Sequence, residues 1–229
     1  MRWRSSRFIL PRPRCRYRSY TGGVFDQIPW TQTSWMQPQS HPYDRFFFDP
    51  TAGDGVGGYT IKKFLDDLTT RYGGIDSVLM WPTYTNIGID DRNQFDFFRT
   101  MPGGLEGVKN VTAELHAAGV RVLWPYNPWD HGTRREPKSD EDTFAELLKL
   151  TGGDGFNGDT MGNIPKSFWD AAKAVSYPLA FEPEGGGRWP HSPSPPSTVT
   201  ALTPCPHART ALGAHWRHGR TLISRSAAP

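Results

Sequence analysis

The sequence has little cysteine and no long apolar run. Its two cysteines, Cys15 and Cys205, lie near the two ends, and the residues between them contain none. A disulfide framework is therefore not expected in the middle of the chain. No apolar run approaches the ~20 residues that a membrane-spanning helix needs, so we expect no membrane partner.

Acidic residues are absent from both ends of the chain. Residues 1–20 carry seven arginines and no acid, and residues 185–229 carry five arginines and no acid. The formal net charge of +3 therefore hides an acidic middle, 21–184, in which 14 basic residues face all 23 acids for a net charge of −9. A basic average would favour a nucleic-acid partner, but an acidic middle without a nucleic-acid-binding motif argues against one.

The two acid-free ends do not resemble folded domains. Residues 1–20 are rich in arginine and contain serine, which is typical of an organellar transit peptide and equally of a disordered leader, so the compartment stays unassigned. Residues 187–229 are biased toward Pro, Ser, Arg and His, which predicts a disordered tail. One folded region is therefore expected, residues 21–186, and the sequence does not indicate its oligomeric state.

Within this region short apolar strands alternate with amphipathic helices. Such alternation predicts βα units and a parallel sheet, and therefore the α/β class. About five units fit into the region, whereas a (β/α)8-type TIM barrel has eight and usually needs ~250 residues. The sequence thus predicts an incomplete (β/α)8-type barrel. A strand that runs into a loop is expected at 28–39, further strands at 75–84, 120–130, 154–161 and 178–186, and helices at 60–74, 104–119, 139–153 and 164–177.

Helix boundaries are marked by ordinary capping residues. Thr60 can cap the helix 60–74, which ends at the glycine pair 73–74. Ser139 and Asp142 have the spacing of a capping box at the start of the helix 139–153. These signals fix the helices more firmly than the strands.

Polar and aromatic residues gather where the strands end. In parallel βα folds the active site lies at the carboxyl ends of the strands, and here those ends carry carboxylates, amides and aromatic rings, with Gln37 and His41 after the first strand. Aromatic faces stack on sugar rings, while carboxylates and amides hold hydroxyls, so a carbohydrate partner is predicted. The predicted substrate-binding residues are Trp81, Tyr84, Asp90, Asp91, Arg92, Trp124, Asn127, Trp129, Asp130 and Asn157.

A weak internal repeat suggests that two strand ends lie at the same rim of the predicted barrel. VLMWPTYTN (78–86) and VLWPYNPWD (122–130) share an apolar run followed by Trp-Pro and then Tyr and Asn. In one layer of a barrel, both Trp-Pro ends would lie at the same rim. Packing at the rim and stacking on a sugar explain these pairs equally well.

Two segments resemble glycoside hydrolases. GLEGVKNVTAELHAAGVRVLWPYNP (104–128) resembles the helix-then-strand segment of α-galactosidase- and α-glucosidase-type enzymes and, more weakly, of α-amylase-type barrels. GGDGFNGDTM (152–161) resembles their next strand, whose final Asp is the catalytic nucleophile. The resemblance spans roughly residues 60–186 and implies a retaining hydrolase with Asp159 as nucleophile, without a cofactor or a metal.

The proton donor is left open by this resemblance. In the α-amylase type it is a Glu on the fifth strand, which implies Glu182 or Glu184, whereas in the α-galactosidase type it lies on a later strand, beyond the five expected here. The chain also departs from the α-amylase pattern: Asn157 stands where that type has Arg, and Pro128 follows Asn127 where it has His. Turnover by this chain is therefore left open.

Other interpretations compete with catalysis. A non-catalytic carbohydrate-binding or interaction protein derived from such a barrel would carry the same residues. Asp159 could cap the next helix, Glu182 and Glu184 could lie in a solvated loop, and the run 90–92 could be a surface ion cluster. A metal-dependent hydrolase using His41, Asp159 and Glu184 is disfavoured because no His-x-His or Glu-x-x-His pair is present.

Overall fold

The computed structural model describes residues 27–52, 58–83, 89–130, 134–184 and 198–199. All of them belong to one compact unit, Gly23–Thr203. The second unit consists of Met1–Gly22 and Pro204–Pro229 and lies outside the described residues, as does almost all of the predicted leader and tail. Within the described ranges no helix is long and apolar enough to cross a membrane.

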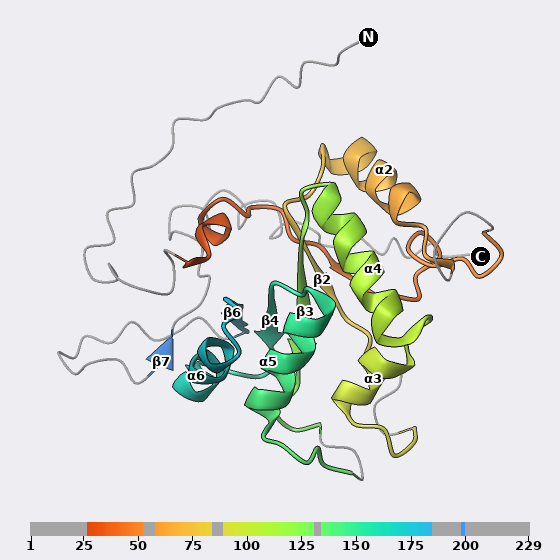
Figure 1. Ribbon diagram of the computed structural model, residues 1–229. Helices are drawn as coiled ribbons and strands as arrows, with labels where there is room; N and C mark the ends of the chain where they lie inside the picture. Colours follow the sequence, from red (N-terminus) through yellow and green to blue (C-terminus); the bar gives the residue numbers. More distant parts are fainter. Residues whose placement is uncertain (1–26, 53–57, 84–88, 131–133, 185–197, 200–229) are drawn as a thin grey trace, which may run out of the picture. The chain divides into compact units, whose positions relative to one another are not determined.

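A parallel five-stranded sheet forms the centre of this unit (Figure 1). Its strand order, β1-β2-β3-β4-β6, follows the chain, and every neighbouring pair is parallel. A parallel sheet wound in chain order is the arrangement of a βα barrel, so the α/β prediction is confirmed. The strands are β1 (Gln39–Ser40), β2 (Ser77–Met80), β3 (Arg121–Tyr126), β4 (Gly155–Gly158) and β6 (Ala180–Pro183).

A second sheet has two short strands and is antiparallel. It joins β5 (Ile164–Pro165), just before the last helix, to β7 (Thr198–Val199). β7 lies inside the segment predicted as a disordered tail.

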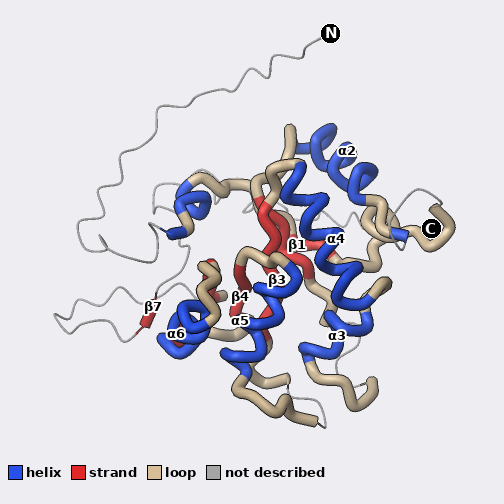
Figure 2. The backbone as a smooth tube through the Cα atoms, in the orientation of Figure 1, coloured by secondary structure: helices blue, strands red, loops and turns tan. Residues whose placement is uncertain are grey.

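The helices alternate with the strands along the chain. They cover one face of the sheet, as Figures 1 and 2 show for α4 and α5. Their apolar stripes supply most of the main core, because residues three and four apart share a helix face. The helical elements are η1 (Pro29–Gln32), α2 (Ile61–Tyr72), α3 (Gln94–Thr100), α4 (Gly104–Ala117), α5 (Asp140–Thr151) and α6 (Lys166–Ala174).

Two helix termini follow the predicted capping residues in part. α2 ends at Gly73, whose φ of 80° is the left-handed conformation that glycine adopts without a steric penalty. Thr60 occupies the N-cap position, but its hydroxyl donates to the Phe46 carbonyl rather than capping the helix. At α5 the Ser139 hydroxyl accepts from the Asp142 N–H, which is one half of the expected capping box.

Two sequence-based assignments were wrong. The segment 28–39 was expected to begin as a strand and run into a loop, but it begins with the short 3-10 helix η1, and the strand β1 is formed only by Gln39 and Ser40 at its end. α3 was not expected at all. Its residues Gln94 to Phe98 are all buried, so this part of the sequence lacks the alternation of apolar and polar faces that predicts a helix.

The helix-facing side of the sheet is packed with aromatic rings. The Phe156 ring lies 5.0 Å from Phe144, 4.9 Å from Phe168 and 5.1 Å from Phe181, measured between ring centroids. These tilted and edge-on contacts are the favourable arrangement for aromatic pairs. Phe156 therefore ties β4 to the helix layer and to the next strand.

The opposite face of the sheet has a different character. Leu79, Trp81 and Leu123 form a small apolar cluster there, with the partly buried Trp30 packed against it. Alternate residues of a strand point to opposite faces, so Asn157 of β4 and Glu182 of β6 share this face. We call it the inner face.

The inner face is concave. Gln37, just before the edge strand β1, donates from Nε2 to Oε2 of Glu182 in the other edge strand, β6, over 2.7 Å. In a flat sheet, strands four spacings apart would lie about 19 Å from each other, too far for these side chains to meet. The sheet must therefore curl around its inner face, as the strands of a barrel do.

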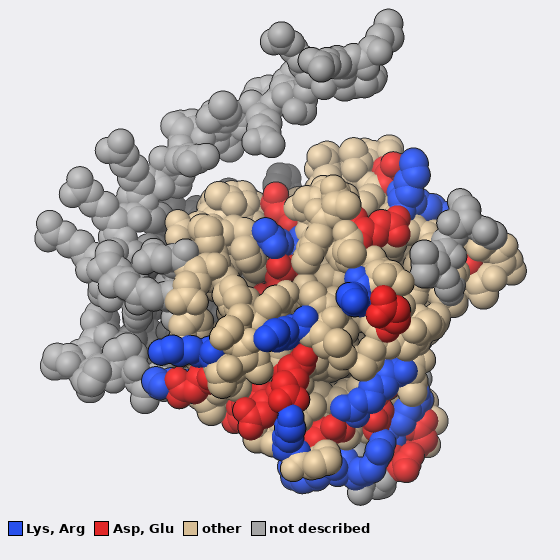
Figure 3. Space-filling model, viewed as in Figure 1, with Lys and Arg blue, Asp and Glu red and all other residues tan. Residues whose placement is uncertain are grey.

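The visible outer surface carries both signs of charge. In Figure 3 basic and acidic side chains alternate over the helices instead of forming a single-sign patch on this face. Several are paired, including Lys166 with Asp170 on α6 and Lys138 with Glu146 on α5. Exposed pairs of this kind contribute little to stability.

Candidate functional site

The candidate catalytic carboxylates lie on neighbouring strands of the inner face. Asp159 directly follows β4, Glu182 lies within β6, and Glu184 follows β6. Asn157 pairs with Glu182 in the strand register, so Asp159 lies one pleat nearer the carboxyl end than Glu182. The two strands thus bring Asp159 near two acids that follow it by 23 and 25 positions in the sequence.

Glu182 is partly buried on the inner face. Burial raises the pKa of its carboxyl, while hydrogen bonds from Gln37 and Asn157 oppose this by favouring the ionised form. The bond from Gln37 is the 2.7 Å contact across the inner face. Glu182 is therefore held in place from both sides by neutral amides.

Asp159 lies at a strained turn. It is 4% exposed, and its N–H donates to the Tyr126 carbonyl, which extends the β3–β4 ladder past β4. The next residue, Thr160, has a φ of 59°, which is unusual for a β-branched side chain. Its N–H donates to Oε2 of Glu184 at 2.6 Å. Strained backbone of this kind is often found at functional sites.

Glu184 differs from Glu182 in position and exposure. Its side chain is exposed, its N–H donates to the Gly158 carbonyl, and its carboxylate holds the Thr160 N–H. Both contacts fix the turn after β4. Glu184 therefore supports the backbone beside Asp159.

A chain of hydroxyl and amide groups runs along the inner face to Glu182. The Ser77 hydroxyl donates to Oε1 of Gln37 at 2.8 Å, and the hydroxyls of Ser34 and Ser77 lie 2.8 Å apart. The sequence did not identify either serine as part of a site. A lone serine within or before a short apolar strand gives no signal of such a role.

Asn127 lies at the carboxyl end of β3 and is completely buried. Its Nδ2 donates to the Thr83 hydroxyl at 3.1 Å, and its main-chain N–H donates to Oε1 of Gln94. Its Oδ1 has no hydrogen-bond partner in the structure. Buried amide oxygens are rarely left unsatisfied, so this atom is a candidate acceptor for a small donor such as a hydroxyl or water.

The three candidate tryptophans have separate environments. Trp81 follows β2 on the inner face and is 6% exposed, and Trp129, beyond β3, is 46% exposed. Trp124 is fully buried on the helix side, with its ring centroid 4.8 Å from that of Phe98. This placement differs from the expected sugar contact, because no part of the Trp124 ring can be reached from outside.

The weak internal repeat of the two Trp-Pro motifs explains this difference. In the register Val78 pairs with Val122 and Leu79 with Leu123. Because the first motif contains the additional residue Met80, Met80 lies level with Trp124 in the neighbouring strand. Trp81 therefore lies one residue further along its strand than Trp124 does along β3. A one-residue offset reverses the face of the sheet to which a side chain points.

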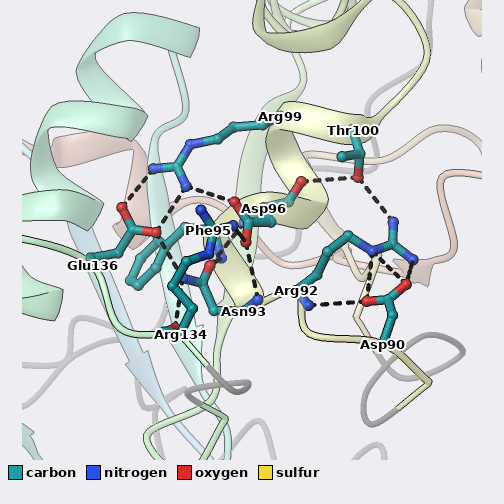
Figure 4. Close-up of polar contacts among 9 residues, drawn as sticks. All are labelled: Asp90, Arg92, Asn93, Phe95, Asp96, Arg99, Thr100, Arg134 and Glu136. Atoms are coloured by element: carbon teal, nitrogen blue, oxygen red, sulfur yellow. Dashed lines mark hydrogen bonds and ion pairs between the residues drawn. The ribbon is translucent and has the colours of Figure 1, made fainter.

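Asp90 and Arg92 form an ion pair with each other. The Arg92 Nε lies 2.9 Å from both carboxylate oxygens of Asp90, and the guanidinium also donates to the Thr100 hydroxyl (Figure 4). Asp91 beside them is exposed. This geometry matches the surface ion cluster that the sequence offered as an alternative. The charges of Asp90 and Arg92 are paired with each other.

A second network fixes α3 to the loop after β3 (Figure 4). The Asn93 side chain accepts from the Asp96 N–H, and the Asp96 carboxylate accepts from the Asn93 N–H, which completes a capping box. Asp96 also pairs with Arg99 and Arg134, and both guanidinium nitrogens of Arg99 hold Glu136 at 2.8 Å. Neither α3 nor this network was anticipated from the sequence.

α3 also reaches the rim at the end of β3. Nε2 of Gln94 donates to the carbonyls of Asn127 and Asp130 at 2.8 and 3.0 Å. Asp130 is 6% exposed. The α3 network therefore holds the rim turn 127–130 in one conformation.

The buried acid Asp154 lies at the opposite end of the sheet, before β4. Its carboxylate receives Nη1 of Arg121 at 2.9 Å and the Val122 N–H at 2.8 Å, and it lies 2.6 Å from Nε2 of His116. These contacts join the end of α4 to the starts of β3 and β4. Asp154 is therefore a structural acid, whereas Asp159 stands at the carboxyl end.

Other features add little to this candidate site. A cavity of about 350 Å³ lies beside Tyr126 and the segment 135–141, away from the candidate carboxylates. The described residues contain no group of three or more His, Cys, Asp or Glu side chains suited to a metal ion. Tyr84 lies outside the described residues, so its expected role is untested.

No protein-family model matches the sequence, and no curated protein matches it significantly. The fold is similar to solved structures of the α-amylase family of glycoside hydrolases. An α-amylase from Geobacillus thermoleovorans, complexed with acarbose, has a TM-score of 0.46 and 16% identity, covering 67% of this chain and 46% of the amylase.

Two streptococcal enzymes give comparable values. The Group B Streptococcus pullulanase SAP has a TM-score of 0.46 and 15% identity, over 75% of this chain and 31% of the pullulanase. The glycogen-degrading pneumococcal virulence factor SpuA has a TM-score of 0.43 and 16% identity, over 72% and 24%. The chain spans less than half the length of each of these structures, which are of the amylase and pullulanase kinds rather than the α-galactosidase type. These likenesses concern the fold alone.

Proposed function

We propose that this chain carries the site of a retaining glycoside hydrolase, with Asp159 as nucleophile and Glu182 as proton donor. The observation that carries the proposal is the placement of the two carboxyl groups on adjacent parallel strands, on one face, near their carboxyl ends. Glu184 supports the turn beside Asp159 through its contact with the Thr160 N–H.

The spacing of the two acids suits this chemistry. Asp159 stands two residues past the partner of Glu182 in the register, so their Cα atoms lie about 8 Å apart, given the rise per residue and the strand spacing. Retaining enzymes hold their two carboxyl groups about 5 Å apart. Side chains that lean toward each other from these positions can reach that separation.

The protonation of Glu182 also suits a donor. A general acid must hold its proton near the working pH, and burial raises the pKa of Glu182 in that direction. The two side chains whose hydrogen bonds shift the pKa of Glu182, those of Gln37 and Asn157, are both neutral amides. Among the described residues, no ion pair with Glu182 therefore favours its charged form.

The reaction would proceed in two balanced steps. First, an Asp159 oxygen bonds to the anomeric carbon while the glycosidic C–O bond breaks, and Glu182 gives its proton to the leaving oxygen. Then Glu182 removes a proton from water, whose oxygen bonds to the anomeric carbon and displaces Asp159. Trp81, Trp129 and Asn127 stand at the same rim as candidate sugar contacts.

The test is hydrolysis of a panel of p-nitrophenyl α- and β-glycosides. Asp159→Asn should abolish release of nitrophenol, and Glu182→Gln should reduce it most for poor leaving groups, because these need the proton. Glu184→Gln should act less strongly. Full activity in Asp159→Asn protein would exclude the assignment.

Azide separates the two roles. Azide added to Asp159→Ala should restore turnover and give a glycosyl azide of inverted configuration, since azide then attacks in place of the nucleophile. With Glu182→Ala the product should retain its configuration. The reverse pattern would exchange the two roles.

A carbohydrate-binding protein without turnover is the second candidate. The observation that favours it is the low exposure of Asp159, at 4%, because a buried carboxylate is poorly placed to attack a sugar. In that case calorimetry should detect sugar binding that survives Asp159→Ala, with no hydrolysis in the parent protein.

A further inference from the structure

The contact between Gln37 and Glu182 is not required by the sheet itself. It joins side chains from the two edges of the sheet, whose strands share no ladder hydrogen bonds. Gln37 lies in an extended segment that runs beside β2, because the carbonyls of Met36 and Pro38 accept from main-chain N–H groups of β2. The amide is therefore presented from a fixed backbone.

The hydrogen bonds leading to Glu182 have one direction. The Ser77 hydroxyl gives its single proton to Oε1 of Gln37, so the short contact between Ser34 and Ser77 must have Ser34 as donor. Occupation of Oε1 by Ser77 turns the Nε2 group of Gln37 toward Glu182. Each donor in this chain points toward the carboxylate, and such chains strengthen their members.

We propose that Gln37 is a positioning residue for the Glu182 carboxyl, and that Ser77 fixes the orientation of the Gln37 amide. The inference rests on the proposed function in so far as Glu182 serves as proton donor. It goes beyond that function by assigning the placement of this donor to a residue from the opposite edge of the sheet.

The proposed role has an electrostatic consequence. Among the described residues, the side chains that hydrogen-bond to Glu182 are Gln37, from the segment before β1, and Asn157, from β4, and neither is charged. The nearest acids along the same two strands are Asp159 and Glu184. Loss of the Gln37 donor should raise the pKa of Glu182 further, and a cation at position 37 should lower it.

The first experiment measures the pKa of Glu182 directly. Carbon-detected NMR of protein labelled at glutamate side-chain carboxyls follows the titration, with Glu182→Gln identifying the resonance. Gln37→Leu should shift the pKa upward by about one unit, and Gln37→Lys should shift it downward. The matched control is Gln39→Leu, an exposed glutamine in β1, which should leave the pKa unchanged.

The opposite signs guard against a trivial explanation. A variant that merely disturbs packing would not move the pKa up with Leu and down with Lys. Circular dichroism and thermal unfolding of each variant check that it is folded. An unchanged Glu182 pKa in both folded variants would overturn the proposal, as would a shift of equal size in Gln39→Leu.

Kinetics then separate positioning from folding. With an aryl glycoside that the parent protein hydrolyses, Gln37→Leu should lower kcat about tenfold with little change in KM. The alkaline limb of the pH profile should move with the measured pKa, upward for Leu and downward for Lys. An unaltered kcat and pH profile would overturn the positioning role.

The two proposals fail in different ways. If the parent protein hydrolyses no glycoside, the proposed function fails, yet the NMR titration still decides whether Gln37 governs the Glu182 carboxyl. If hydrolysis is present and Glu182 titrates independently of residue 37, the function stands and the Gln37 inference falls.

Discussion

Gly155 and Ala180 face each other in adjacent strands so closely that a side chain on Gly155 has no room. A Cβ built on Gly155 would lie 2.0 Å from the Ala180 carbonyl oxygen. Gly155 alternates with Asn157 along β4, so this Cβ would point toward the inner face. β6 therefore leans over β4 on the concave side, at the place where the sheet curls toward the Gln37–Glu182 contact.

Gly155→Ala should consequently destabilise the protein strongly. The added methyl group meets rigid backbone rather than a movable side chain, so we expect a loss of about 3 kcal/mol in the free energy of unfolding. Urea denaturation would measure it. Gly162→Ala is the control, because nothing lies within 4 Å of its Cβ position. Equal stability of the two variants would contradict a tight curl at β4.

Glu182 predicts a pH dependence of stability. Its pKa is raised in the folded state because of burial, so the folded protein holds this proton more tightly than the unfolded chain. Its contribution to stability is present below the unfolded pKa, near 4.5, and is lost as the pH rises through the folded pKa. Glu182→Gln removes the titration. We therefore expect the variant to become more stable relative to the parent as the pH rises from acid toward neutrality.

Urea midpoints measured at several pH values test this sign. The comparison is between parent and variant at each pH, which cancels the other titrating groups. Glu184→Gln serves as the exposed control on the same strand. A variant that loses stability relative to the parent with rising pH would show that Glu182 is stabilised as the carboxylate.

Trp124 and Trp129 should separate stability from sugar binding. Trp124→Phe reduces a fully buried ring that contacts Phe98, so the expected cost is about 2 kcal/mol in unfolding free energy, with sugar affinity unchanged. Trp129→Ala removes a ring that is 46% exposed at the rim, so it should lower affinity with little cost in stability. Calorimetric titration and urea denaturation of both variants give the four values. Loss of affinity in the Trp124 variant would contradict the assignment of its ring to the core.

Most of the helices could be predicted because their signals are local. The stripe of α2 and the αL position of Gly73 are both readable within one segment. The faces of Trp81 and Trp124 were not predictable, since they depend on the register between β2 and β3, and one residue of offset reverses the face. α3 was not predicted because it is short and its first five residues are all buried, and because its N-cap Asn93 lies next to charged residues that resemble a binding loop.

For the candidate site, the sequence predicted which residues lie at the strand ends but not how their side chains contact one another. Asp159 and Glu182 could be placed at strand ends from the sequence, but the contact between Gln37 and Glu182 depends on the curl of the whole sheet. No local pattern encodes a contact between residues 145 positions apart. The structure therefore adds the relation between the two sheet edges, which the sequence does not contain in any one segment.

The Asp96 network should be worth more than its exposed counterparts. Asp96 caps α3 and accepts from Arg99 and Arg134 while its side chain is only 8% exposed. Asp96→Ala should therefore cost about 2 kcal/mol in unfolding free energy. Lys62→Met, which breaks an exposed pair with Asp66 on α2, should change it by less than about 0.5 kcal/mol. Similar small losses in both would show that α3 does not depend on this network.

The two acids that flank β4 should behave oppositely when neutralised. Asp154, before the strand, holds Arg121, His116 and the Val122 N–H, so Asp154→Asn should lower the free energy of unfolding by about 2 kcal/mol. The protein that remains folded should keep any sugar binding and turnover that the parent shows. Asp159→Asn should remove turnover while the fold persists, because the proposed role of Asp159 is chemical.

Both variants change one carboxylate to an amide of the same size at positions only five residues apart, which makes each the control of the other. Urea denaturation and glycoside hydrolysis, measured on the same preparations, give the comparison. If Asp159→Asn instead unfolds as readily as Asp154→Asn and leaves turnover intact, the acid at the carboxyl end of β4 is structural too. The two acids that flank this strand would then both serve the fold, and a carbohydrate-binding role would have to rest on the rim residues Trp81, Trp129 and Asn127.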